Sequence, residues 1–224
     1  MTHRDSRGVS VLEFSLVLPW MVLLFLGTVA IGINLIRGLQ VVQLSRDAGH
    51  MFARGMNFSL PGNKKILQRV GQSVGLDAYN TSSSQAVVYL SALTWVDRWT
   101  CKAGGKADTS NPPNPVGCTN HRKWVFTRPQ LNFGNVAVKA STYGTPTGMV
   151  AQTDGTYRAS DYVTQAGAVV APAFSRLNLD PPPETDSAAV PTGEMVFLSE
   201  AAVRGFGVPG VGYTGPPLVA YGVF

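Results

Sequence analysis

The chain has 224 residues, of which 45% are hydrophobic and only 14% are charged, with 24 glycines and 15 prolines. This apolar content combined with so few charges excludes intrinsic disorder. A domain of roughly 150 residues within this chain could bury about two-thirds of its unfolded surface, so the protein is not a small disulfide-dense scaffold either.

The formal net charge of +5 is unevenly distributed. Residues 1–76 hold eight of the 18 Lys and Arg and three of the 13 Asp and Glu, so the whole excess lies in the N-terminal third. A basic segment beside an apolar one is typical of membrane orientation rather than of phosphate binding. We therefore expect no nucleic acid among the partners.

A membrane span is predicted near the N-terminus. Residues 14–33 are 20 consecutive positions without a charge, about 30 Å of helix and thus the thickness of a bilayer core. Arg4 and Arg7 precede this run and favour a cytoplasmic N-terminus, although Arg37 and further arginines follow it. The run is longer than the apolar region of a signal peptide and lacks a small-x-small cleavage site at its end. We expect a retained helix.

A carboxylate, Glu13, stands at the start of this run, five residues after Gly8. An acidic side chain at the centre of a bilayer costs about 2.5–3.5 kcal/mol on insertion scales, so Glu13 needs a partner. Cleavage after Gly8 would create an α-amino group on Val9, four residues before Glu13. In the alternative, Gly8 is a linker residue and Glu13 is an interfacial charge that extends toward the headgroups.

The segment Gly8-Val-Ser-Val-Leu-Glu-Phe-Ser-Leu-Val-Leu-Pro19 resembles the class III signal of type IV pilins and pseudopilins. Together with the apolar stretch and Leu44-Ser-Arg-Asp-Ala-Gly-His-Met-Phe-Ala-Arg54, it resembles the TadE-like family of the tight-adherence (Flp) pilus system. The resemblance implies processing between Gly8 and Val9 by a prepilin peptidase and a role for Glu13 in assembly.

The domain organisation predicted on this basis has three parts. Residues 1–8 form a cytoplasmic leader peptide, residues 9–55 a transmembrane and spine helix, and residues 56–224 an extracytoplasmic head. The spine is expected to be helical to about Gly55 because its apolar residues recur with a 3.6-residue period on one side. That side carries Val41, Leu44, Ala48, Met51, Phe52 and Gly55.

The head is predicted to be α+β, with an antiparallel β-sheet laid on the spine helix in a pilin-like arrangement. A short helix is expected over residues 59–75, with Pro61 in its first turn. Its core positions are Ile66, Leu67, Val70 and Val74. Segments rich in β-branched and aromatic residues predict strands over 85–96, 123–128, 131–138, 195–199 and 218–224.

Residues 140–193 are rich in Gly, Pro, Ser and Thr and are expected to be a loop-like insertion. Such a stretch is either a ligand surface or a tolerated insertion.

Cys101 and Cys118 are the two cysteines of the chain and are separated by 16 residues. With the head outside the cytoplasm, a disulfide between them is expected. The alternatives are two reduced thiols or a metal site, and the second is disfavoured because His121 alone stands nearby.

Catalytic motifs are weak in this sequence. Neither Gly-x-Ser-x-Gly nor His-Glu-x-x-His occurs. Gly205-Phe-Gly-Val-Pro-Gly210 has the letters of a dinucleotide fingerprint, but Pro209 and the prolines that follow cannot open a helix there, so a turn is predicted. We expect no catalytic, cofactor-binding or metal-binding residues and no enzymatic activity.

Three functional hypotheses follow. The first is a minor pilin or pseudopilin, cleaved after Gly8, that takes part in tight-adherence pilus assembly, surface attachment or related secretion. Its partners would be other pilin subunits, the assembly platform, prepilin peptidase and inner-membrane lipid. It would lie in a bacterial inner membrane with a cytoplasmic N-terminus and a periplasmic or extracellular head, or in a surface pilus. The second is an uncleaved single-pass membrane-anchored periplasmic binding module or adhesin, and the third is an anchored enzyme.

Overall fold

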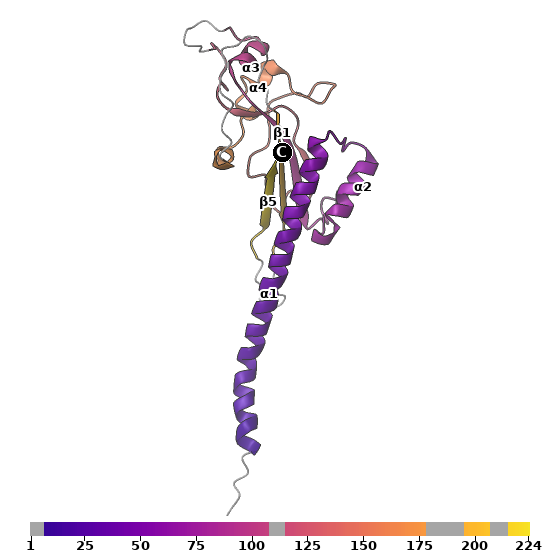
Figure 1. Cartoon of the computed structure of the whole chain (residues 1–224), viewed down its shortest axis with the longest axis vertical. Coiled ribbons are helices and arrows are strands. Elements are labelled where there is room, and N and C mark those ends of the chain that lie inside the picture. Colours follow the sequence, from indigo (N-terminus) through magenta and orange to yellow (C-terminus); the bar gives the residue numbers. More distant parts are fainter. Residues whose placement is uncertain (1–6, 108–114, 178–194, 207–214) are drawn as a thin grey trace, which may run out of the picture.

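One long helix carries a compact head at its C-terminal end (Figure 1). The computed structural model describes residues 7–107, 115–177, 195–206 and 215–224. Helix α1 (Arg7–Ala53) has 47 residues, about 70 Å at 1.5 Å per residue, and continues through Pro19. With the antiparallel sheet of the head, this helix confirms the predicted α+β class.

The head is built on an antiparallel sheet in which β1 (Ala86–Trp95) is central. On one side β1 pairs with β4 (Met195–Val203), which in turn pairs with β5 (Leu218–Val223). On the other side, β2 (Trp124–Phe126) pairs with the C-terminal half of β1 and β3 (Leu131–Gly134) with its N-terminal half. The two short strands therefore lie one after the other along the same edge of β1.

The C-terminal half of α1 packs across one face of this sheet, mainly against β4 and β5 (Figure 1). Val41, Leu44, Ala48 and Phe52 are at most 8% exposed, so the predicted apolar side is confirmed at these positions. Met51 is partly buried, whereas Gly55 is exposed and lies beyond the end of α1 at Ala53, so its place on that side was wrong. The sheet residues that form this core with α1 are Ala86, Val88, Leu90, Ala92, Phe133, Ala201, Val203 and Ala220.

Helix α2 (Pro61–Val70) and the 3-10 turn η1 (Gln72–Val74) lie beside α1. Pro61 occupies the first turn of α2, where its missing N–H has no helical partner to lose. The predicted helix over 59–75 is divided at Gly71. The side chain of Leu76 packs closely against Gly71, and a Cβ on residue 71 would lie only 2.6 Å from it.

The core positions predicted for this helix are only partly confirmed. Leu67 and Val74 are buried as expected, whereas Ile66 is 43% exposed, so its assignment to the core was wrong. Helix α2 contacts the core through the side that carries Leu67 and Val70, and this side is too narrow to include Ile66.

Two predicted strand ends were also wrong. Strand β3 ends at Gly134, whose φ of +89° departs from strand geometry, and a turn closed by the Val138 N–H and the Asn135 carbonyl follows. Strand β4 continues past Ser199 to Val203, and Glu200 in this extension is buried and accepts hydrogen bonds from Ser141 and Thr142.

The opposite face of the sheet supports a second core. Tyr143, Tyr157 and Phe174 are buried there against Leu93 and Leu198. The segment that supplies them contains short helices, α4 (Ala159–Tyr162), η2 (Ala166–Ala168) and η3 (Pro172–Leu177). Residues 140–177 are thus largely irregular, as expected, but form part of the head, and residues 178–194 lie outside the described part.

Candidate functional site: the exposed half of the N-terminal helix

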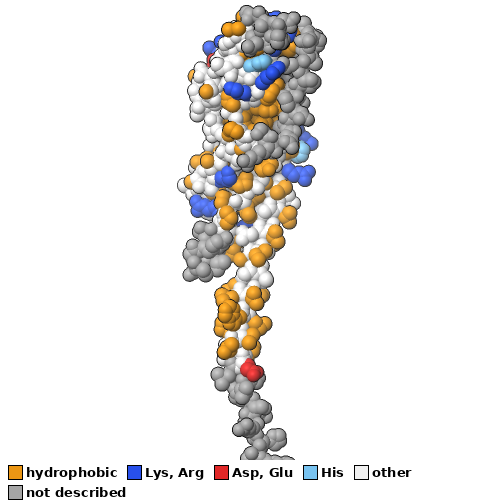
Figure 2. Space-filling model, turned by 90° about the vertical axis from the view of Figure 1, so that its left-hand side faces the viewer, with side chains coloured by type: hydrophobic (Ala, Val, Ile, Leu, Met, Phe, Trp, Pro, Cys, Tyr) orange, Lys and Arg blue, Asp and Glu red, His pale blue; other side chains and the backbone are white. Residues whose placement is uncertain are grey.

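The N-terminal half of α1 projects from the head, and Figure 2 shows hydrophobic side chains along its visible face; residues 13–29 are all exposed. The large apolar side chains at Val11 and over residues 14–29 are 41–72% exposed. Contiguous apolar surface on this scale marks a membrane or protein interaction site. The helix is long and apolar enough to cross a membrane, which fits a membrane-anchored protein.

The residues predicted for processing and assembly lie at the start of this exposed half. Gly8, Val9 and Glu13 all fall within α1, and the Glu13 side chain is exposed. Positions 9 and 13 are one turn apart, about 6 Å along the axis, and share one side of the helix. The helix therefore places positions 9 and 13 on the same side, while cleavage after Gly8 stays a prediction.

The head meets α1 at the point where the charge-free run ends. The backbone N–H of Phe206 donates to Asn34 Oδ1 at 3.0 Å. The guanidinium of Arg37 lies 5.5 Å from the centre of the Phe206 ring and donates to the Arg204 carbonyl oxygen at 3.5 Å. We call this region, made of residues 34–37, 72–75, 85 and 203–206, the foot of the head. Sequence reasoning missed it, because nothing local links Asn34 to a segment 172 residues away.

The predicted disulfide is confirmed at the other end of the head. Cys101, in α3 (Arg98–Ala103), is bonded to Cys118, and their Cα atoms are 5.8 Å apart. Asp97 caps α3 by accepting a hydrogen bond from the Thr100 N–H at 2.6 Å. Both cysteines are buried with Val96, Val125, Val163 and Ala168, so the bond fastens α3 to the segment before β2.

A buried carboxylate, also missed from the sequence, lies on the second face of the sheet. Glu200 is 2% exposed and accepts hydrogen bonds from Ser141 Oγ at 2.8 Å and from the Thr142 N–H at 2.7 Å. Burial, with smaller contributions from the charges of Tyr221 and Glu200, raises the pKa of Tyr143 to about 12. These contacts hold residues 141–143 on the sheet.

The histidines do not form a site with other ligating groups in the described part of the chain. His50 packs its ring against Phe224, and His121 lies in the loop before β2. Within the described ranges, no group of three or more His, Cys, Asp and Glu residues could hold a metal ion. His3 and most of the segment 205–210, predicted to be a turn, lie outside the described residues.

The exposed apolar half of α1 fits a membrane anchor, and the same helix continues into the core of the head. Residues 8–50 match the sequence model of the TadE-like protein family. A search of curated proteins and a search of solved structures each found no match. The matched segment begins at Gly8 and ends within the buried part of α1, so the spine of this chain is TadE-like. This match confirms the resemblance for the N-terminal segment of the chain.

Proposed function

We propose that the chain is a minor pilin or pseudopilin of the tight-adherence pilus. In this proposal α1 inserts into the inner membrane, prepilin peptidase cuts the chain after Gly8, and the mature protein joins or primes the filament. The observation that carries the proposal is the continuity of α1, whose N-terminal half is exposed and apolar while its C-terminal half is built into the core of the head.

This continuity favours an assembly subunit over a tethered binding module. A binding module needs only an anchor and a linker, and a flexible linker leaves its head free to reorient. Here the helix enters the head without a break, and contacts at Asn34 and Arg37 fix the head directly above the apolar run. The head therefore has a fixed direction relative to its membrane helix, as stacking in a filament requires.

The exposed half of α1 can be stable both in a lipid bilayer and among the helices of other subunits. Leu16, Trp20 and Leu24 are 67–72% exposed, and apolar side chains occupy every side of the helix. A helix that is apolar all round is stable either in lipid or among other helices. Such a helix can leave the bilayer and pack among the spines of neighbouring subunits.

Glu13 supplies the polar contact in this assembly. A charge in an apolar environment is costly alone and much less so when paired. In the proposal, the Glu13 carboxylate of one subunit pairs with the Val9 amino group of its own chain or of the next subunit, which favours a fixed axial register.

The head in this proposal has a structural role rather than an enzymatic one. Its buried carboxylates already hold parts of the fold together, since Asp97 caps α3 and Glu200 fixes residues 141–142.

A substitution at the proposed cleavage site tests this function. Gly8→Leu should block processing, because the peptidase must approach the backbone closely at a residue without a Cβ. The variant should still insert, since the apolar run is unchanged, but should be absent from isolated filaments. Gly27→Leu is the matched control, because a Cβ at Gly27 has nothing within 4 Å. Normal processing and filament entry of Gly8→Leu would contradict the proposal.

A further inference from the structure

A cavity of about 400 Å³ opens at the foot of the head. It is lined by Arg37 of α1, by Gln72 and Ser73 of η1, by Gln85 before β1, and by Arg204 and Phe206 after β4. These residues come from four separate parts of the chain. The cavity exists because the Phe206 backbone is fastened to Asn34 and the Arg37 guanidinium is held against the Phe206 ring.

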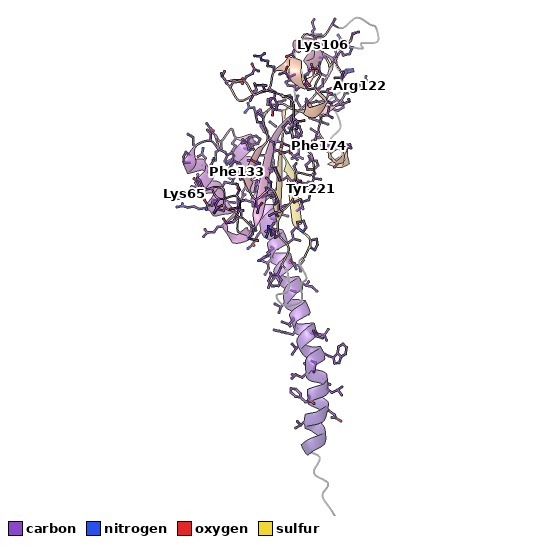
Figure 3. All side chains as sticks on the ribbon, turned by 180° about the vertical axis from the view of Figure 1, so that it is seen from behind. Lys65, Lys106, Arg122, Phe133, Phe174 and Tyr221 are labelled. Atoms are coloured by element: carbon purple, nitrogen blue, oxygen red, sulfur yellow. A yellow bond between two sulfur atoms is a disulfide. The ribbon has the colours of Figure 1, made fainter. Side chains whose placement is uncertain are left out.

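The cavity is positively charged. Its two charged lining residues are arginines, and Arg204 is exposed. Lys65 and Arg69 of α2 line an adjoining cavity that shares Gln72, Gly75 and Gln85 with the first. Figure 3 shows Lys65 on the flank of the head, nearer the foot than Lys106 and Arg122 at the far end.

The adjoining cavity also contains one carboxylate, Asp77. Its Oδ1 already accepts hydrogen bonds from the N–H groups of Tyr79 and Asn80 at 3.0 and 2.8 Å. These bonds lower its pKa, so Asp77 remains charged, but the cations around the two cavities outnumber it. An anion is therefore the ligand that this surface favours.

The position of the cavity relative to the membrane identifies the anion. Arg37 is the first charged residue after Glu13 and lies four residues beyond Ile33, the end of the predicted 14–33 span, about 6 Å along the helix. The polar headgroup layer is about 5–8 Å deep on each side of the hydrocarbon core. When residues 14–33 span the core, Arg37 and the cavity beside it lie at the depth of the lipid phosphates.

We propose that the foot of the head binds the phosphate group of an anionic phospholipid while the subunit is in the membrane. Arg37 and Arg204 bind the phosphate oxygens, for which the planar guanidinium is well suited. Gln72 and Ser73 supply neutral donors, and Phe206 lies at the interface, where aromatic side chains are favoured. The inference rests on the membrane-inserted state in the proposed function, and it implies that a subunit must release a lipid before it enters a filament.

Native mass spectrometry of the full chain in a non-ionic detergent tests this site. The protein is titrated with phosphatidylglycerol, with phosphatidylcholine and with inorganic phosphate in parallel. We expect one retained phosphatidylglycerol and weaker retention of phosphatidylcholine. Each arginine near a membrane surface contributes roughly fivefold to binding, so the double variant Arg37→Gln, Arg204→Gln should bind phosphatidylglycerol about 25-fold more weakly.

Two further variants separate recognition from misfolding. The double variant Arg37→Lys, Arg204→Lys keeps both charges and should retain more phosphatidylglycerol than the glutamine variant. The double variant Lys106→Gln, Arg122→Gln removes two cations at the far end of the head and should bind like the parent. Equal retention of the two lipids, or parental binding by Arg37→Gln, Arg204→Gln, would overturn the proposal.

The remaining outcomes are also distinct. Displacement of the lipid by millimolar inorganic phosphate would identify a free-phosphate site and overturn the lipid assignment. A mature chain that still begins at Met1 would overturn the cleavage proposal and leave the lipid result unchanged.

Discussion

The ring of Phe224 occupies the space that a side chain on Gly49 would need. A Cβ built on Gly49 would overlap that ring, which also lies edge-on to His50 with the ring centres 4.6 Å apart. The backbone of Phe224 exchanges two hydrogen bonds with Phe197, at 2.9 and 3.0 Å. The segment after β5 is thereby fastened both to the sheet and to the spine helix.

Gly49→Ala should destabilise the head by about 1–3 kcal/mol, the usual cost of overpacking. Gly38→Ala is the matched control, since it lies in the same helix with nothing within 4 Å of a Cβ, and should stabilise by up to about 1 kcal/mol. Chemical unfolding in detergent measures both. Adding Phe224→Ala should relieve much of the Gly49→Ala defect, because the two residues are in contact. Equal stability of Gly49→Ala and Gly38→Ala would show that the contact is unimportant.

Removal of the Cys101–Cys118 bond should lower the free energy of unfolding by about 3 kcal/mol, the value for a loop of this size in the chain-entropy model. The double variant Cys101→Ala, Cys118→Ala should insert into membranes normally, because the span is a distant segment. Thiol titration of unfolded, unreduced protein from the cell envelope should find no free thiol from this pair. Two free thiols would place the head in a reducing compartment and reverse the predicted orientation.

The stability of the head should fall at alkaline pH. Burial raises the pKa of Tyr143 from 10.0 to about 12, so above pH 10 the unfolded chain loses this proton before the folded one does. Stability from this residue is therefore complete below about pH 10 and is lost as the pH rises toward 12. Tyr143→Phe should reduce the slope of unfolding free energy against pH in this window. An unchanged slope would contradict the assignment.

Glu13→Ala and Glu13→Gln should both be inserted and cleaved but should fail to enter filaments. Alanine removes the carboxylate, and glutamine keeps its size and hydrogen bonding but removes the charge. Thr28→Val is the matched control, because it removes an exposed hydroxyl that bonds only locally, to the Phe25 carbonyl at 2.8 Å. Quantification of each variant in isolated filaments is the measurement. Parental assembly of both Glu13 variants would make Glu13 an interfacial residue only.

The sequence predicted the parts of the fold that depend on periodicity. Val41, Leu44, Ala48 and Phe52 recur on one side of a helix, and that side is buried. The five strand segments were also found, because β-branched and aromatic residues mark each of them. Gly8 and Glu13 could be chosen as candidate site residues because they are five residues apart and Glu13 directly precedes an apolar run.

The remaining features depend on contacts between distant segments. Glu200 lies inside a strand because residues 141–142 donate hydrogen bonds to it, and no local pattern reveals these partners. Tyr143, Tyr157 and Phe174 are isolated aromatics in a stretch of loop composition, yet they form the second core. The foot of the head depends on a contact between Asn34 and Phe206.

The mature N-terminus tests the central claim most directly. Intact mass and terminal sequencing of membrane-derived protein, from cells that contain a prepilin peptidase, should show a chain that begins at Val9 and is eight residues shorter than the 224-residue sequence. A chain that still begins at Met1 would contradict the pilin account and support an uncleaved membrane-anchored binding module.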